Sequence, residues 1–151
     1  MPTEPTPTGR ASEPEFSAGG VVVRGDDVVV IVPTRRGPGG AKVLSLPKGH
    51  PEAGESAAEG AMREVREEAG VCGELLEPLG VVEYTYERRH RRIAKRVEFF
   101  LIEYREGDPA DHDHEVEQAR WMPLAEAATA LTYAGEREIV ARALSRRASE
   151  R

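Results

Sequence analysis

Three glutamates stand close together near the middle of the sequence, and their spacing suits metal binding. Glu64, Glu67 and Glu68 occupy positions i, i+3 and i+4, which project from one side of a helix. Like charges at this spacing destabilise a helix unless something positive lies among them. Hard divalent cations take such oxygen ligands, and Mg²⁺ does so while it keeps waters and contacts substrate phosphates. The spacing therefore suggests a magnesium site before any family is considered.

The segment that carries these glutamates has the signals of an amphipathic helix. Ser56 followed by Glu59 is typical of a capping box at the start, and Gly70 is a natural C-terminal stop. Apolar residues recur at helical spacing and form one stripe to be buried, namely Ala58, Ala61, Met62, Val65 and Ala69. The alternative interpretation is a solvated helix held together by ion pairs such as Glu59–Arg63.

Residues 49–71 resemble the Nudix box, Gly-x5-Glu-x7-Arg-Glu-U-x-Glu-Glu-x-Gly-U, in which U is aliphatic. The match holds at every fixed position, namely Gly49, Glu55, Arg63, Glu64, Val65, Glu67, Glu68, Gly70 and Val71. In a chain of this composition a chance match is roughly a 10⁻⁵ event. We therefore expect a member of the Nudix hydrolase family.

This resemblance implies an α/β (α+β) fold, specifically an α/β/α sandwich around a mixed β-sheet. It implies Mg²⁺ as the cofactor, with Mn²⁺ as a substitute, and hydrolysis of a nucleoside diphosphate linked to another moiety. The implied metal ligands are the Gly49 carbonyl and the carboxylates of Glu64, Glu67 and Glu68.

The resemblance also implies which residues act in catalysis. Glu115 lies six residues before Trp121, where family members often have a glutamate that reaches the metal site. The implied general base is Glu64, Glu68 or Glu115, and the sequence does not choose among them. Arg63 and Glu55 would orient the metal ligands.

Two cations stand where they could contact a substrate phosphate. Lys48 comes immediately before the box, and Arg35 lies in a glycine-rich loop. A lysine contacts phosphate as a point charge, whereas an arginine does so through its planar fork. Ordinary exposed cations are the alternative interpretation for both.

Tyrosines and a further lysine are candidates for the rest of the substrate site. Tyr84 and Tyr86 share one face of an expected strand, and Lys95 is in line with apolar neighbours on the next. Tyr133 lies between two expected helices. This grouping resembles the substrate side of dinucleoside polyphosphate hydrolases, where aromatic rings stack on adenine. Tyrosines packed in the core, and a lysine that snorkels to the surface, are the alternatives.

Residues 87–96 carry six fixed positive charges in an otherwise acidic chain. A charge run of this kind is usually a solvated hairpin loop. The competing interpretation is an electrostatic clamp for a substrate with many negative charges.

The preferred substrates are dinucleoside polyphosphates such as diadenosine tetra- or hexaphosphate. The grounds are the Pro-Lys-Gly-His sequence at residues 47–50, the basic run and the tyrosines. One departure is that many such enzymes have a tyrosine 16–18 positions beyond the box, whereas Tyr86 falls one residue early. Nucleoside triphosphates (oxidised or ordinary), ADP-ribose and diphosphoinositol polyphosphates are alternatives. A non-catalytic nucleotide sensor is an alternative of another class, although every box glutamate is present.

The chain length and charge limit the remaining classes. Residues 1–14 hold four prolines and no aliphatic cluster beyond Met1, which predicts a disordered tail. The length of 151 residues predicts a single domain, which we expect over residues 15–148. The net charge of −6 argues against binding to a nucleic-acid duplex or a membrane surface. One cysteine and no apolar run of about 20 residues favour a cytoplasmic protein. We expect a monomer or homodimer that acts on a small nucleotide or polyphosphate.

The elements that must position these residues follow from the hydrophobic pattern. Strands are predicted for residues 16–24 and 28–34, covered on both faces because they are nearly continuous valine, and for residues 41–46. Extended structure is predicted for residues 74–86 and for the segment that runs from Lys95 to Tyr104. Two helices follow, one from Pro123 to about Leu131 and one over residues 136–147.

Overall fold

The valine-rich strands near the N-terminus form the centre of the sheet. A computed structural model describes residues 15–150, in which β1 (Glu15–Arg24) and β2 (Asp27–Pro33) form an antiparallel hairpin. Successive residues of a strand point to opposite faces. Val21 and Val23 accordingly pack into one core and Val22 into the other. The prediction that this hairpin is covered on both faces is confirmed.

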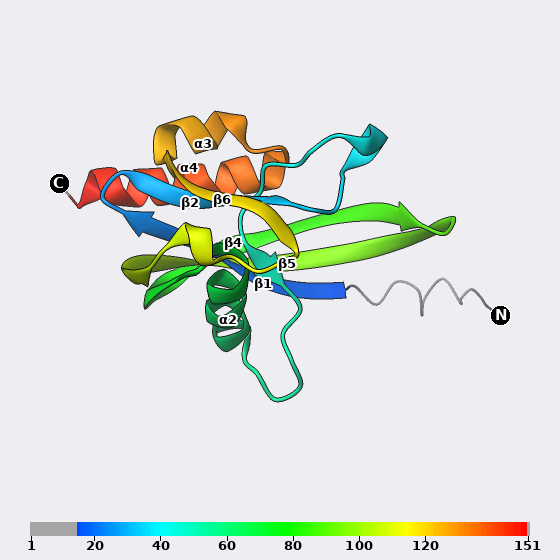
Figure 1. Ribbon diagram of the computed structural model, residues 1–151, viewed down its shortest axis with the longest axis horizontal. Coiled ribbons are helices and arrows are strands. Elements are labelled where there is room, and N and C mark those ends of the chain that lie inside the picture. Colours follow the sequence, from blue (N-terminus) through cyan, green and yellow to red (C-terminus); the bar gives the residue numbers. More distant parts are fainter. Residues whose placement is uncertain (1–14, 151) are drawn as a thin grey trace.

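A mixed sheet surrounds this hairpin (Figure 1). Its strand order is β4-β5-β1-β2-β6, with β4 at Val71–Arg88, β5 at Arg91–Gly107 and β6 at Val116–Pro123. The short β3 (Lys48–Gly49) pairs with β1. The β1–β5 pairing is parallel and the other pairings are antiparallel, so the sheet is mixed, as predicted.

Helices cover the sheet on both sides (Figure 1). On one side α2 (Ala57–Ala69) buries Val65 and Ala69. On the other side α3 (Leu124–Ala130) and α4 (Ala134–Ser149) bury residues that include Leu124, Ile139 and Val140. Two short 3-10 turns, η1 (Pro38–Gly40) and η2 (Pro109–Asp111), lie in connections. The predicted three-layer α/β/α sandwich is confirmed.

The start and end of α2 follow the capping signals in its sequence. Ser56 Oγ accepts a hydrogen bond from Glu59 N at 3.1 Å, and Glu59 Oε1 accepts one from Ser56 N at 2.9 Å. Gly70 ends the helix with a left-handed φ of 71°, a conformation that glycine adopts without a steric penalty. The register of the box glutamates is therefore set locally.

The predicted strand over residues 41–46 is wrong. Only Ser45 makes a strand-like contact, an isolated bridge to Ile31. Leu44 N donates instead to Thr132 Oγ1 at 2.8 Å, and Leu46 N donates to Glu136 Oε1 at 3.0 Å. Side chains from the α3–α4 connection and from the first turn of α4 thus satisfy backbone groups that a neighbouring strand would otherwise have paired.

The basic run is mostly strand rather than loop. β4 continues to Arg88 and β5 begins at Arg91, so the turn is limited to Arg89 and His90, with φ of 53° and 65°. Two consecutive left-handed residues are typical of a tight hairpin turn. The two strands form a long ribbon whose turn extends away from the helices (Figure 1).

Several predictions about organisation remain predictions. The expected tail over residues 1–14 lies outside the described residues, and the single domain over residues 15–148 and the cytoplasmic location are not tested. Within residues 15–150, no helix is long and apolar enough to cross a lipid bilayer.

Candidate active site

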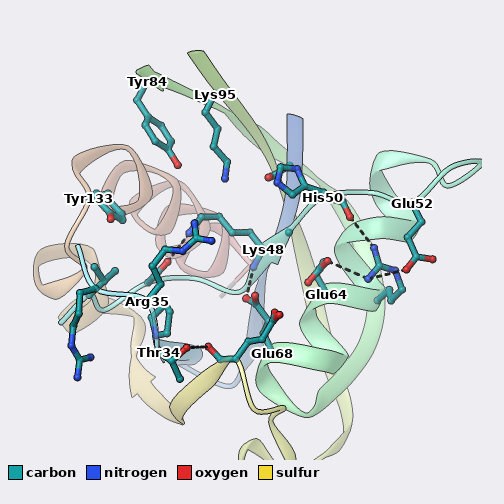
Figure 2. A pocket seen from close by; sticks show the side chains of 18 residues that line it. Thr34, Arg35, Lys48, His50, Glu52, Glu64, Glu68, Tyr84, Lys95 and Tyr133 are labelled. Carbon is teal, nitrogen blue, oxygen red and sulfur yellow. Dashed lines mark hydrogen bonds and ion pairs between the residues drawn. The ribbon is translucent and has the colours of Figure 1, made fainter. Parts of the chain in front are cut away.

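A cavity of about 520 Å³ opens between α2, the segment that precedes the box and the β4–β5 ribbon (Figure 2). Most of the site residues predicted from the sequence line it, namely Arg35, Lys48, Gly49, Arg63, Glu64, Glu68, Tyr84, Lys95, Glu115 and Tyr133. Glu55, Glu67 and Tyr86 are not among the lining residues. Residues far apart in the sequence therefore meet at one place.

Two box carboxylates, one turn apart on α2, face this cavity. Burial, together with repulsion from Glu64 and Asp113, raises the pKa of Glu68 to about 7 although Lys48 N donates to it. Burial also raises the pKa of Glu64, and repulsion from Glu67 and Glu115 adds to this increase against the attraction of Arg63. Buried, desolvated carboxylates that repel one another are stabilised in their charged form by a cation placed between them.

Gly49 allows the backbone to approach the box helix closely. Its strand β3 is held by pairing of Gly49 with Ala18 of β1, and the Lys48 backbone N–H donates to Glu68 Oε1 at 3.0 Å. A Cβ atom at Gly49 would overlap the Glu64 carboxyl group. Any side chain at this position would displace the Glu64 carboxyl group from its place beside the Gly49 backbone.

Arg63 holds several acidic side chains and one carbonyl in fixed positions. It donates to Glu55 Oε2 at 2.8 Å and Oε1 at 3.0 Å, to Glu64 Oε2 and Glu67 Oε1 at 3.2 Å each, and to the His50 carbonyl at 3.0 Å. The hydrogen bond from Arg63 lowers the pKa of Glu55. These contacts suit the orienting role predicted for Arg63 and Glu55.

Glu67 lies apart from the other two box carboxylates. Its side chain is 46% exposed and binds Arg63. Within residues 15–150, no group of three or more His, Cys, Asp or Glu side chains is arranged to hold a metal ion. Mg²⁺ commonly uses only one or two protein carboxylates and takes waters and substrate phosphates for the rest. Glu64, Glu68 and the adjacent Gly49 backbone fit that pattern.

Glu115 reaches the cavity from the loop before β6. Thr34 holds its carbonyl through both N, at 3.0 Å, and Oγ1, at 3.1 Å. Asp113 Oδ1 accepts from Glu115 N at 3.0 Å, and Asp113 N donates to the Glu67 carbonyl at 2.8 Å. The backbone of Glu115 is thus fixed from β2 and from α2, while its carboxylate makes no hydrogen bond or ion pair with any residue of the 15–150 range.

Lys48 has a buried partner that nothing in the sequence indicated. Glu136, at the start of α4, is only 3% exposed. Its Oε2 lies 2.9 Å from Lys48 Nζ, which also donates to Ser45 Oγ at 2.7 Å. Burial lowers the pKa of Lys48, but attraction to Glu136 outweighs it and the pKa is raised overall. The positive charge of Lys48 is therefore already balanced by Glu136, which limits the predicted role of Lys48 as a phosphate contact.

The opposite side of the cavity carries two stacked tyrosines and a lysine. The rings of Tyr84 and Tyr133 lie 6.3 Å apart, centroid to centroid, at an angle of 13°. Figure 2 shows Tyr84 and Lys95 pointing into the cavity from neighbouring strands. Burial and repulsion from Lys48 lower the pKa of Lys95, against the attraction of Glu15, its neighbour on β1. Lys95 forms no ion pair within the described part of the chain, and Arg35 lies nearby on the lining.

Two further placements complete the site. Tyr86 lies one same-face position beyond Tyr84, and its hydroxyl donates to Glu15 Oε1 at 2.6 Å instead of facing the cavity. Ser17 is fully buried on the lining, and its Oγ has no hydrogen-bond partner among the described residues. Nothing in the sequence indicated Ser17, because a serine within a strand is common.

The fold and the box geometry agree with comparisons with known proteins. The chain belongs to the NUDIX domain family, whose model matches residues 14–143. A Mycobacterium tuberculosis protein named for the MutT mutator, MutT4, is 39% identical over 130 residues, covering 83% of this chain and 52% of that protein. The NAD-capped RNA hydrolase NudC of Pseudomonas aeruginosa is 36% identical over 104 residues, covering 69% and 34%. This chain thus spans about half the length, or less, of these relatives.

Solved structures support the same architecture. A NUDIX hydrolase from Nitrosomonas europaea superposes with a TM-score of 0.74 at 21% identity, covering 89% of this chain and 91% of that one. A C. elegans Ap4A hydrolase binary complex superposes with a TM-score of 0.65 at 20% identity, covering 89% and 98%. At these identities the likeness establishes the fold alone.

Proposed function

We propose that this chain is a Mg²⁺-dependent pyrophosphohydrolase that cleaves nucleoside diphosphates linked to another moiety, with dinucleoside polyphosphates as the preferred substrates. One observation carries the proposal. Glu64 and Glu68 line the same cavity as a stacked pair of tyrosines and the unpaired Lys95. Carboxylates suit a metal, a lysine suits phosphate, and aromatic rings suit a base.

The residues that would hold the metal are Glu64, Glu68 and the Gly49 carbonyl, while Glu67 would first have to leave Arg63. When bound, Mg²⁺ would neutralise the pyrophosphate and lower the pKa of a bound water. Mn²⁺ would serve as a substitute because it takes similar oxygen ligands.

When water attacks phosphorus, it must lose one proton to a general base. The water oxygen forms a bond to phosphorus, the bridging P–O bond breaks, and the leaving phosphate departs with its electron pair. Of the three candidates for general base, Glu64 is bound to Arg63 and Glu68 accepts from Lys48 N. The Glu115 carboxylate has no such bond within residues 15–150, which favours it as the base.

Lys95 is the better candidate for a direct phosphate contact. Lys48 is held by Glu136 and Ser45, so its charge is already compensated. Lys95 is partly buried, and its neighbour on β1, Glu15, is already bound to Tyr86 and Arg88. Burial lowers the pKa of Lys95 despite the attraction of Glu15, and a bound phosphate would stabilise the charged lysine. Arg35, exposed on the opposite loop, adds a second cation to the same cavity.

The choice of dinucleoside polyphosphates rests on the tyrosine pair and on two cations that line the same cavity, Lys95 and Arg35. The C. elegans structural neighbour is named an Ap4A hydrolase, and its likeness to this chain supports the fold only. Nucleoside triphosphates, ADP-ribose and diphosphoinositol polyphosphates remain alternatives, as does a nucleotide sensor without catalysis. We also propose a cytoplasmic monomer or homodimer that binds neither duplex nucleic acid nor membrane.

Product analysis by anion exchange tests the proposal. The purified chain is incubated with Mg²⁺ and, separately, with diadenosine tetra- and hexaphosphate, ADP-ribose, nucleoside triphosphates including 8-oxo-dGTP, and a diphosphoinositol polyphosphate. Selective release of ATP from the dinucleotides is the expected result. Cleavage of triphosphates alone would refute the substrate choice, and binding without cleavage of any compound would favour the sensor.

A further inference from the structure

One face of the β4–β5 ribbon runs without interruption from the cavity to the hairpin turn. In an antiparallel pair, directly opposite residues share a face, and every second pair lies on the same side. Three such pairs follow one another outward: Tyr84 with Lys95, Tyr86 with Ile93, and Arg88 with Arg91. The first pair lines the cavity. The face that enters the cavity therefore continues to the arginines at the turn.

The outer end of this face is hollowed and positively charged. A second concavity, of about 420 Å³, is lined by Arg88, Arg89, Arg91 and Ile93. Arg88 is bound to Glu15 at 2.8 Å. Arg89 and Arg91 are exposed and form no ion pair within residues 15–150. Two guanidinium groups are thus free to bind an anion.

The opposite face of the same ribbon lacks this charge. There Arg92 stands opposite Glu87, and Arg96 stands opposite Glu83 with an N–O distance of 3.7 Å. Each arginine on that face has a glutamate as its cross-strand neighbour. The unpaired positive charge is therefore concentrated on the face that leads into the cavity.

We propose that this face binds the far end of a long substrate, namely the distal phosphates and second nucleoside of a dinucleoside polyphosphate. The inference rests on the function proposed above and adds where the second half of the substrate lies. Lys95 and Arg91 are four residues apart, which corresponds to about 13 Å along a strand. An arginine fork matches phosphate geometry, and Ile93 offers an apolar surface to a base.

This arrangement makes affinity depend on substrate length. A ligand that ends within the cavity reaches Lys95 but not Arg91. A ligand with a long phosphate chain reaches both, so Arg91 contributes only to the longer ligand. Arg91 and Arg92 are adjacent in sequence and equal in charge but lie on opposite faces, which makes Arg92 a matched control.

Calorimetric titration tests this inference separately from turnover. The Glu68→Gln chain, alone and with Arg91→Ala or Arg92→Ala added, is titrated with diadenosine hexaphosphate and with ADP in the presence of Mg²⁺. Arg91→Ala should raise the Kd for the hexaphosphate about fivefold, which corresponds to one exposed charge contact. It should change the Kd for ADP less than twofold, and Arg92→Ala should leave both values unchanged.

Two outcomes would overturn the inference. An equal rise in the Kd for the hexaphosphate with Arg91→Ala and with Arg92→Ala would mean that the ligand responds to the overall positive charge of the ribbon and not to a contact with Arg91. An unchanged Kd with Arg91→Ala would mean that the substrate ends inside the cavity. The proposed function is tested independently, by turnover of the unmodified chain, so its failure would be seen in the product analysis and not in these Kd values.

Discussion

The two walls of the cavity differ in how their polar groups are held. On the inner wall, formed by α2, β3 and the start of α4, charged groups are buried and bound: Glu68 to the Lys48 backbone, and Lys48 to Glu136. On the outer wall, formed by the β4–β5 ribbon and the loop with Arg35, Lys95 forms no ion pair among the described residues, and its neighbour Glu15 is bound to Tyr86 and Arg88. A fixed wall suits chemistry, which requires exact geometry, whereas unpaired cations suit recognition. Changes to the inner wall should therefore lower kcat or stability, and changes to the outer wall should raise KM.

The largest effect should come from Glu68→Gln. Replacing a carboxylate that faces the metal position by a neutral amide should lower kcat roughly 10³-fold, comparable to the loss of a key catalytic group. The circular dichroism spectrum should be unchanged because Gln keeps the size of the side chain and can still accept from Lys48 N. Turnover near the unmodified rate would show that Glu68 is not part of the chemistry.

Glu136→Gln should reduce stability more than any exposed substitution. Removing one partner of a buried ion pair leaves an uncompensated charge on Lys48, and the expected loss is about 3 kcal/mol in the free energy of unfolding. Urea denaturation measures this loss. Glu138→Gln is the control because Glu138 is two residues further along α4 and exposed.

A second substitution, at Lys48, tests the cause of this loss of stability. If the loss of stability comes from the unpaired positive charge on Lys48, adding Lys48→Met to Glu136→Gln should restore part of it. No recovery in the double variant would mean that the loss does not come from the unpaired charge on Lys48.

Glu115→Gln should lower kcat roughly 10²-fold, at the lower end for loss of a general base. KM should change little because the backbone of Glu115 stays fixed by Thr34. Glu117→Gln is the matched control, since Glu117 lies on the same segment but is bound to Lys42 and Arg36. Similar kcat values for the two variants would leave Glu64 and Glu68 as the remaining bases.

Lys95→Met should give the smallest of these effects, on the outer wall. Met keeps the packing of the aliphatic stem, so the loss of charge should raise KM roughly tenfold, the equivalent of one charged contact, with little change in kcat. Lys42→Met, on an exposed lysine already bound to Glu117, should leave both constants unchanged. A fall in kcat without a rise in KM would place Lys95 on the chemical side of the site and break the division between the walls.

The sequence predicts the inner helix better than its surroundings because the signals for α2 are local. Ser56, Glu59 and Gly70 act on their immediate neighbours, so the register of the glutamates follows from residues a few positions away. The contact between Lys48 and Glu136 joins residues 88 positions apart. A glutamate in the first turn of a helix is ordinary, so nothing marked Glu136 as a buried partner.

The outer wall was harder to predict for a different reason. The basic run was visible in the sequence, but which arginines face the cavity depends on where the turn falls. With the turn at Arg89 and His90, Arg91 lies on the cavity side and Arg92 on the other. A shift of register by one residue would exchange them. The error over residues 41–46 has a similar origin, since the partners of that backbone are distant in sequence, namely Thr132 in the α3–α4 connection and Glu136 in α4.

The contact between Glu136 and Lys48 has a consequence for how the protein is made. Chains emerge from the ribosome N-terminus first, and folding begins before synthesis ends. When β6 has just emerged, the whole box is outside, but Glu136 is still inside the exit tunnel. Lys48 then lacks its partner and the Leu46 backbone lacks its acceptor. The segment that leads into the box thus reaches its final position only when α4 arrives, so a nascent chain that has emerged only as far as β6 has the box but not the finished cavity.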